Sequence, residues 1–242
     1  YGGLGALEVA ATAPPSLEGV AALSVYGQAW QAFHPGGLSN SGFPVGWMQD
    51  LARDSQPLGA PWIAQRVAKG DAACQRNQRL HGQGIDLKKR YLGSVPNDGR
   101  FDPLSPATWA KTIKVPVFLS GQLQDATIGS DLADVWSAFD KASVRKLVLT
   151  NGTHGDAVSP QVLRRMHQFL SLYVKDQVPG RFDTATLLRK TQPKADPRRL
   201  PMGPDLPITF PAGTSAHQAR QIYEAGPEAE VLFESGNGGR PE

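Results

Sequence analysis

Residues 113–125 decide the fold, and they read IKVPVFLSGQLQD. The first eight of these residues are mostly apolar and β-branched, which predicts a buried strand of a parallel sheet. Pro116 is expected among the first residues of this strand, because proline cannot donate to a sheet ladder. Residues 121–125 then predict a loop at the carboxyl end of the strand, ending on the carboxylate of Asp125.

The same pattern repeats directly downstream. Residues 131–141 predict an amphipathic helix, because Leu132, Val135, Trp136 and Phe139 share one face. A second strand is predicted at residues 145–150, a turn with His154 at 151–155, and another helix at 159–175. This alternation of strand and helix predicts an α/β fold with a parallel sheet.

Asp125 and His154 therefore follow the carboxyl ends of two successive strands. Open α/β sheets place their chemistry at this edge, and right-handed crossovers bring successive loops to the same side. A carboxylate on one imidazole nitrogen fixes the tautomer and leaves the other nitrogen free to take a proton from a hydroxyl. We predict that the two side chains meet as catalytic residues. Asp125 taken alone is also compatible with a helix cap or a turn.

The first eleven residues read YGGLGALEVAA, a glycine-rich turn that runs into a helix. A preceding strand and Gly-x-Ser would complete the Gly-x-Ser-Tyr-Gly nucleophile elbow of α/β-hydrolases. The backbone N–H of Tyr1 would then point into the oxyanion hole. We expect the serine directly before Tyr1, in the order Ser, Asp, His of this fold. The glycines alone are also compatible with a linker or a weak phosphate loop.

The remaining segments complete an expected domain plan. Aromatic residues, glycines and prolines crowd the stretch after residue 26, which predicts a helical cap that shapes an active-site pocket, or plain helical packing. The stretches 207–210 and 228–234 predict strands that either begin a β domain or join the hydrolase body. The plan is core at 1–25, cap at 26–110, core at 111–180, and linker with the start of a β domain at 181–242.

Composition excludes several classes of function. The 242 residues carry a net charge of +3, with 40% hydrophobic and 19% charged residues, as in ordinary globular proteins. The basic residues form no stripe with interleaved aromatics, so a nucleic-acid partner is not expected. No window of 18 apolar residues predicts a membrane span. No His, Cys or carboxylate cluster has ligand spacing, and the expected chemistry implies neither a metal nor an organic cofactor.

These residues resemble the cocaine-esterase and X-Pro dipeptidyl-peptidase branch of serine α/β-hydrolases. The resemblance is carried by Tyr1-Gly2-Gly3, Ser105-Pro106, Trp109, Lys114-Val115-Pro116-Val117, Gly121, Asp125 and Gly152-Thr153-His154-Gly155. It implies hydrolysis of an ester or amide through an acyl-enzyme, with His154 relaying the proton, Asp125 orienting His154 and Tyr1 N–H holding the oxyanion. It also implies a second tyrosine from an earlier strand and a C-terminal jelly roll, which residues 231–236 resemble at its entry.

Two alternatives stay open at this point. The chain is compatible with a truncated or non-catalytic hydrolase-fold protein that only binds, and with an acyltransferase on the same triad. The expected partners are a small-molecule ester or amide and the N-terminal part of the same hydrolase. Without that part, the polypeptide is expected to be inactive. None of Ser39, Ser41 and Ser120 lies in an elbow. The sequence contains no pattern that indicates the compartment or the oligomeric state of the protein.

Overall fold

The computed structural model describes residues 1–82, 97–126, 128, 132–180 and 208–232. The chain forms two compact units, one of residues 1–28 with 102–242 and the other of residues 29–101. The first unit holds the parallel sheet, and the second is helical in its described residues. The domain boundaries and the cap role expected from the sequence stay predictions.

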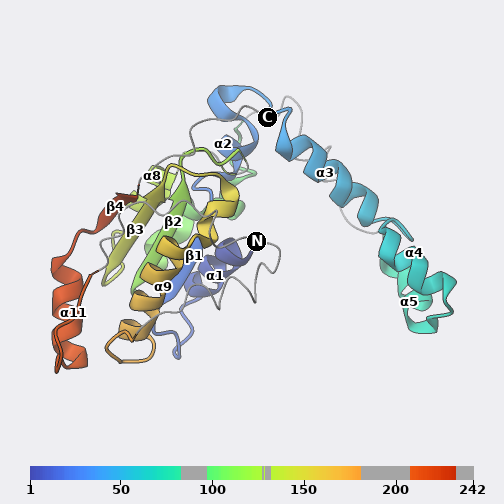
Figure 1. Ribbon diagram of the computed structural model, residues 1–242. Helices are drawn as coiled ribbons and strands as arrows, with labels where there is room; N and C mark the ends of the chain where they lie inside the picture. The colour runs from blue at the N-terminus through green and yellow to red at the C-terminus, as the bar shows by residue number, and fades with distance from the viewer. Residues whose placement is uncertain (83–96, 127, 129–131, 181–207, 233–242) are drawn as a thin grey trace, which may run out of the picture. The chain divides into compact units, whose positions relative to one another are not determined.

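A parallel sheet organises the first unit (Figure 1). Among the described residues it has four strands in the order β1 (Val20–Leu23), β2 (Val117–Gln122), β3 (Arg145–Thr150) and β4 (Ala229–Leu232). Leu23 pairs with Ser120, and Gln122 pairs with Thr150. The carboxyl ends of the strands therefore meet at one edge of the sheet, and the α/β class predicted from the sequence is confirmed.

Helices cover both faces of this sheet. Alternate residues of β2 point to opposite faces: Val117 and Leu119 belong to one buried cluster, and Phe118 belongs to the other. The first cluster includes Leu7 of α1 (Gly2–Ala11) and Val135 of α8 (Leu132–Ala138). The second includes residues of α9 (Pro160–Tyr173) and α11 (Ala216–Ala225). Burial of each large apolar side chain stabilises the fold by about 1.5–3 kcal/mol.

The central strand lies later in the chain than predicted. The expected strand at 113–120 is observed at 117–122, because Pro116 cannot donate to the ladder. The short helix η4 (Ala110–Thr112) ends directly before the expected start of the strand. The carbonyl of Pro116 still accepts a hydrogen bond from the N–H of Val20 at 2.9 Å. Two residues assigned to the loop, Gly121 and Gln122, belong to the strand.

The other predicted elements of the first unit agree more closely. The expected elements at 1–11, 131–141, 145–150 and 159–175 are observed as α1, α8, β3 and α9. Two short segments, η3 (Asp102–Leu104) and α7 (Pro106–Trp109), precede η4.

The C-terminal segment differs from the prediction. Residues 208–210 form no strand, and helix α11 lies between the two stretches that were predicted as strands. A capping box begins α11, in which Ser215 and Gln218 satisfy each other's backbone N–H. The strand β4 pairs in parallel with β3. The strand β4 therefore extends the sheet of the first unit, which agrees with the second of the two alternatives. Residues 181–207 of the expected linker region, and the part of the jelly-roll resemblance beyond residue 232, lie outside the described residues.

The second unit is helical in its described residues, as its composition predicted. Its elements are α2 (Ala29–Phe33), η1 (Pro35–Gly37), α3 (Phe43–Asp54), α4 (Pro61–Ala68), α5 (Ala72–Asn77) and η2 (Gln78–Leu80). His34 is buried, with its ring stacked on Trp30 at 5.2 Å and edge-on to Phe101 at 6.0 Å between centroids. His34 is thus a packed core histidine of this unit.

Candidate active site

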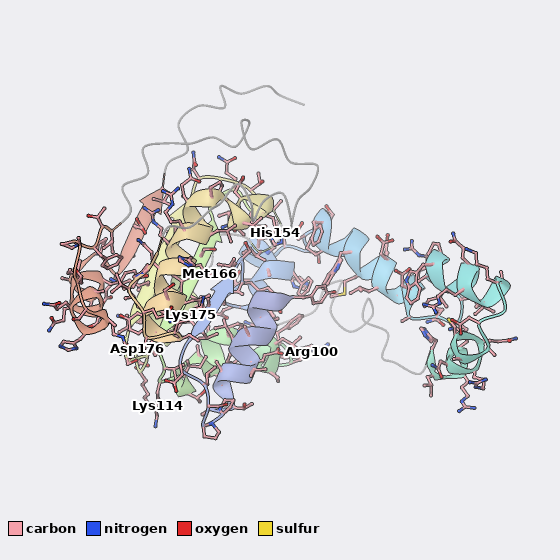
Figure 2. The ribbon with its side chains drawn as sticks, turned by 60° about the horizontal axis from the view of Figure 1, so that its bottom comes forward. Arg100, Lys114, His154, Met166, Lys175 and Asp176 are labelled. Carbon is pink, nitrogen blue, oxygen red and sulfur yellow. The ribbon has the colours of Figure 1, made fainter. Side chains whose placement is uncertain are left out.

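Asp125 and His154 meet at the carboxyl edge of the sheet. Oδ2 of Asp125 lies 2.7 Å from Nδ1 of His154 (His154 is labelled in Figure 2). The carboxylate side chain is 0% exposed, whereas the imidazole is 54% exposed. With Nδ1 on the carboxylate, Nε2 is the ring nitrogen left to act on a reacting group. The pair thus joins a buried carboxylate to an accessible imidazole.

Backbone hydrogen bonds hold the turn that carries Asp125. The N–H of Asp125 donates to the carbonyl of Gln122 at 3.2 Å, which closes the turn directly after β2. The N–H of Ile128 donates to Oδ1 of Asp125 at 3.2 Å. The N–H of Gln124 donates to the carbonyl of Gly152 at 3.0 Å, which joins the Asp turn to the His loop. Each carboxylate oxygen of Asp125 therefore has a defined partner.

His154 is held by a capped helical turn that the sequence reasoning did not anticipate. It is the first residue of η5 (His154–Val158), and Thr153 is the N-cap. Oδ2 of Asp156 accepts from the N–H of Thr153 at 2.6 Å and from its hydroxyl at 3.1 Å. A Cβ on Gly152 would lie 2.3 Å from the same oxygen, so glycine is needed there. The spacing Thr-x-x-Asp was the signal for this cap.

The start of α1 lies at the same edge. A Cβ on Gly3 would lie 2.5 Å from the carbonyl oxygen of Leu23 and 2.8 Å from Cγ1 of Val25. The first turn of α1 is therefore packed against the end of β1. Tyr1 is the N-cap of this helix, and its carbonyl accepts from the N–H of Gly5 at 2.9 Å. The third predicted site residue thus belongs to the same edge as Asp125 and His154.

Two further polar residues at this edge were missed. Ser24 follows β1 and donates its hydroxyl to Oε1 of Gln122, which is 2% exposed. Ser24 has a φ of +49°, a conformation that residues other than glycine seldom adopt.

Ser120, considered above as an alternative nucleophile, is 0% exposed inside β2. Its burial excludes it from attack on a substrate in this structure.

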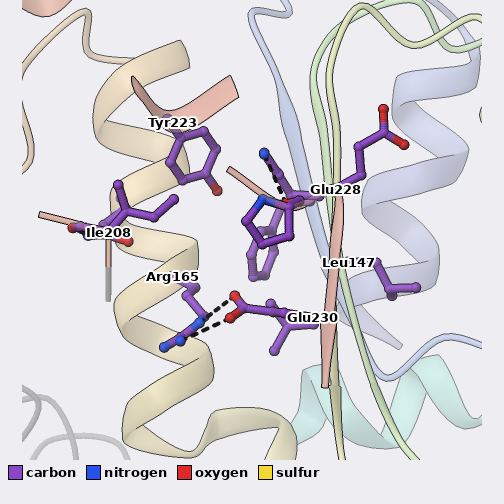
Figure 3. Close-up of a pocket in the computed structure, with 11 residues that line it drawn as sticks. Leu147, Arg165, Ile208, Tyr223, Glu228 and Glu230 are labelled. Atoms are coloured by element: carbon purple, nitrogen blue, oxygen red, sulfur yellow. Dashed lines mark hydrogen bonds and ion pairs between the residues drawn. The ribbon is translucent and has the colours of Figure 1, made fainter. Parts of the chain in front are cut away.

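A separate cavity of about 80 Å³ lies where the C-terminal segment packs on the sheet (Figure 3). Its walls include Arg165 of α9, Tyr223 of α11 and Glu230 of β4. Dashed lines in Figure 3 join the guanidinium of Arg165 to both carboxylate oxygens of Glu230. Neither Asp125 nor His154 lines this cavity. It belongs to the packing of the C-terminal segment, not to the edge that carries Asp125 and His154.

The fold and the edge residues define a class of protein. A parallel sheet with an Asp turn and a His loop after consecutive strands, and a helix start beside them, is the arrangement of an α/β-hydrolase. The sequence model of the X-Pro dipeptidyl-peptidase (S15) family matches residues 1–156, and the chain belongs to this family. The protein is therefore a serine hydrolase of the peptidase kind. A search of curated proteins found no match to the chain.

The matched region ends two residues after His154, so it includes the Asp turn, the His loop and the start of α1. Within the described residues, no group of three or more His, Cys, Asp or Glu side chains is arranged to hold a metal ion. No helix in those residues is long and apolar enough to cross a membrane.

Proposed function

We propose that Asp125 and His154 are two members of a Ser-His-Asp triad that cleaves an ester or amide bond through an acyl-enzyme. The nucleophile is a serine expected directly before Tyr1, in a longer polypeptide that includes the residues preceding Tyr1. The single observation that supports this proposal best is the 2.7 Å contact between Oδ2 of Asp125 and Nδ1 of His154. It joins an inaccessible carboxylate to an accessible imidazole at the edge where α1 begins.

In the proposed reaction each group has its own step. Nε2 of His154 takes the proton as the serine hydroxyl forms a bond to the carbonyl carbon of the substrate. The buried carboxylate of Asp125 stabilises the imidazolium, since opposite charges attract more strongly away from water. The backbone N–H of Tyr1 donates to the oxygen that becomes negative in the tetrahedral intermediate.

Collapse of that intermediate breaks the bond to the leaving group, which receives the proton from His154. Water then repeats the sequence on the acyl-enzyme, with His154 again acting first as base and then as acid. The carboxylic acid product leaves, and the serine regains its proton. Esters and amides share this route, so the same residues serve both bond types. The family name points first to amide bonds that follow proline.

The test uses the longer polypeptide that includes the residues before Tyr1. A fluorophosphonate probe should label the serine directly before Tyr1, as peptide mapping by mass spectrometry would show. The same protein should hydrolyse a p-nitrophenyl ester or an X-Pro p-nitroanilide, and His154→Ala should abolish both turnover and labelling. Residues 1–242 alone should do neither. An adduct on Ser120, or turnover by residues 1–242 alone, would overturn the assignment.

A further inference from the structure

The Ser24–Gln122 pair lies beside the catalytic edge and has no role in the mechanism described so far. Gln122 is the last residue of β2, and its carbonyl accepts from the N–H of Asp125 at 3.2 Å. Its side-chain Oε1 accepts from the hydroxyl of Ser24. One residue therefore connects the turn that carries Asp125 to the end of β1.

Ser24 in turn lies next to the packing site of α1. Its chain neighbours Leu23 and Val25 supply the atoms that approach Gly3 most closely. The N–H of Ser24 donates to the carbonyl of Ser120 at 3.0 Å, so its backbone stays tied to β2 despite the φ of +49°. Uncommon backbone conformations of this kind persist where their surroundings hold them, and they cluster at functional sites.

The amide nitrogen of Gln122 is the unexplained atom of the pair. Nε2 is buried and has no hydrogen-bond acceptor among the residues that the structure describes. Buried amide donors nearly always have an acceptor. An acceptor for Nε2 is therefore expected on a part of the protein that packs beside Ser24 and is not among the described residues.

The sheet register indicates which part this is. β1 ends at Leu23, opposite Ser120, so Gln122 lies past the end of β1 and its side chain contacts Ser24 there. Within the described sheet, β1 pairs with β2 on one edge. A right-handed crossover through α1 places the strand that leads into α1 beside the other edge of β1. The nucleophile turn would then lie beyond Ser24, on the side of β1 away from β2.

We propose that Gln122 is a positioning residue whose Nε2 donates to a backbone carbonyl of the nucleophile turn, the segment that leads into Tyr1. This inference rests on the proposed function, since it requires the serine to lie on that turn. Gln122 then holds three parts of the site together. Its carbonyl holds the Asp125 turn, its Oε1 holds Ser24, and its Nε2 fixes the distance between the serine and His154.

The test compares Gln122→Met with the wild type in the longer polypeptide, because methionine keeps the length of the side chain and removes the amide. The rate constant for fluorophosphonate labelling and kcat should both fall by about tenfold to a hundredfold, as expected for a displaced nucleophile. KM and the midpoint of the pH–rate profile should stay unchanged, since Asp125 and His154 still meet. Ser24→Ala should cause a smaller loss of the same kind that does not add fully to that of Gln122→Met.

Gln168→Met is the matched control. Gln168 is also a buried glutamine, and it lies on α9. Its Nε2 donates to the carbonyl of Ile208 at 2.8 Å. It should lower Tm without changing the labelling rate. The inference is overturned if Gln122→Met is labelled at the wild-type rate, or if its loss merely parallels its change in Tm. If Gln122→Met does not fold, the labelling rate of Ser24→Ala tests the inference instead, and a wild-type rate in that variant would overturn it. If the wild type itself is not labelled before Tyr1, the proposed function fails instead.

Discussion

Oδ2 of Asp125 lies 2.7 Å from Nδ1 of His154 although the two residues are 29 positions apart in the sequence. The register of β2 against β3 brings them together, since Gln122 pairs with Thr150 and the two turns begin directly after these residues. The carboxylate stays buried and the imidazole stays half exposed. A relay needs this asymmetry, because only the base must reach the substrate.

Asp125→Asn is expected to lower kcat by about 10⁴-fold in the longer polypeptide, the typical loss when a triad carboxylate becomes an amide. The amide nitrogen cannot accept from Nδ1–H, so His154 is held in the wrong tautomer. Steady-state hydrolysis of a p-nitrophenyl ester measures the effect. Asp140→Asn, an exposed carboxylate after α8, serves as control and should leave kcat unchanged. A loss of less than about tenfold in Asp125→Asn would contradict the triad role.

Gly3→Ala and Gly5→Ala should change stability in opposite directions. A Cβ on Gly3 would lie 2.5 Å from the Leu23 carbonyl, whereas a Cβ on Gly5 meets nothing within 4 Å. Alanine at Gly5 should stabilise α1 by about 0.5–1 kcal/mol through its higher helix propensity. Alanine at Gly3 should destabilise the protein by about 1–3 kcal/mol and lower kcat, because the first turn of α1 must move away from β1. Urea unfolding tests both, and equal effects would contradict the close approach.

The strand and helix periodicity was sufficient to predict the α/β class and the loops of Asp125 and His154. Those elements are long and strongly patterned, and crossover handedness then places both loops at one edge. The boundaries of β2 were less predictable. The apolar run at 113–120 contains Pro116, and only the residues after this proline belong to β2. The residue at which β2 begins depends on its pairing with β3.

The Ser24–Gln122 contact could not be predicted from the sequence, because it depends on where β1 ends relative to β2. Helix α11 was missed for another reason. Its apolar contacts, such as Ala219 and Tyr223, are few and widely spaced, and much of its surface is polar. The Ser215-x-x-Gln218 spacing was the local signal for its start. Its stability comes from packing on α9 and β3, which no local pattern reveals.

Glu230→Ala and Glu228→Ala compare two glutamates of the same segment. Glu230 pairs with Arg165, whose side chain is 6% exposed, whereas Glu228 is 63% exposed and lies 3.2 Å from Arg145. Loss of Glu230 leaves a buried guanidinium without its carboxylate, so we expect a loss of about 3 kcal/mol. Loss of Glu228 should cost at most about 1 kcal/mol. Urea unfolding measures both losses of stability. Similar losses in the two variants would mean that the buried guanidinium of Arg165 does not need the carboxylate of Glu230.

The alkaline limit of stability should depend on Tyr223. This side chain is 3% exposed, and burial raises the pKa of its phenol. A tyrosine in the unfolded chain ionises at about pH 10. The stabilising effect is therefore complete below that pH and is lost as the pH rises toward the raised pKa of the folded state. Tyr223→Phe removes this titration, so its free energy of unfolding should fall less steeply above about pH 10.

At pH 7, Tyr223→Phe should change stability by no more than about 1 kcal/mol, because the shape of the ring is kept. Tyr173→Phe provides the comparison. The hydroxyl of Tyr173 donates to Glu224 at 2.9 Å, and burial also raises the pKa of this phenol. Tyr173→Phe should therefore cost about 1 kcal/mol already at pH 7 and should also flatten the alkaline limb. Urea titrations at pH 7 and in the alkaline range separate the two effects. A wild-type slope in Tyr223→Phe would show that the phenol ionises equally in both states.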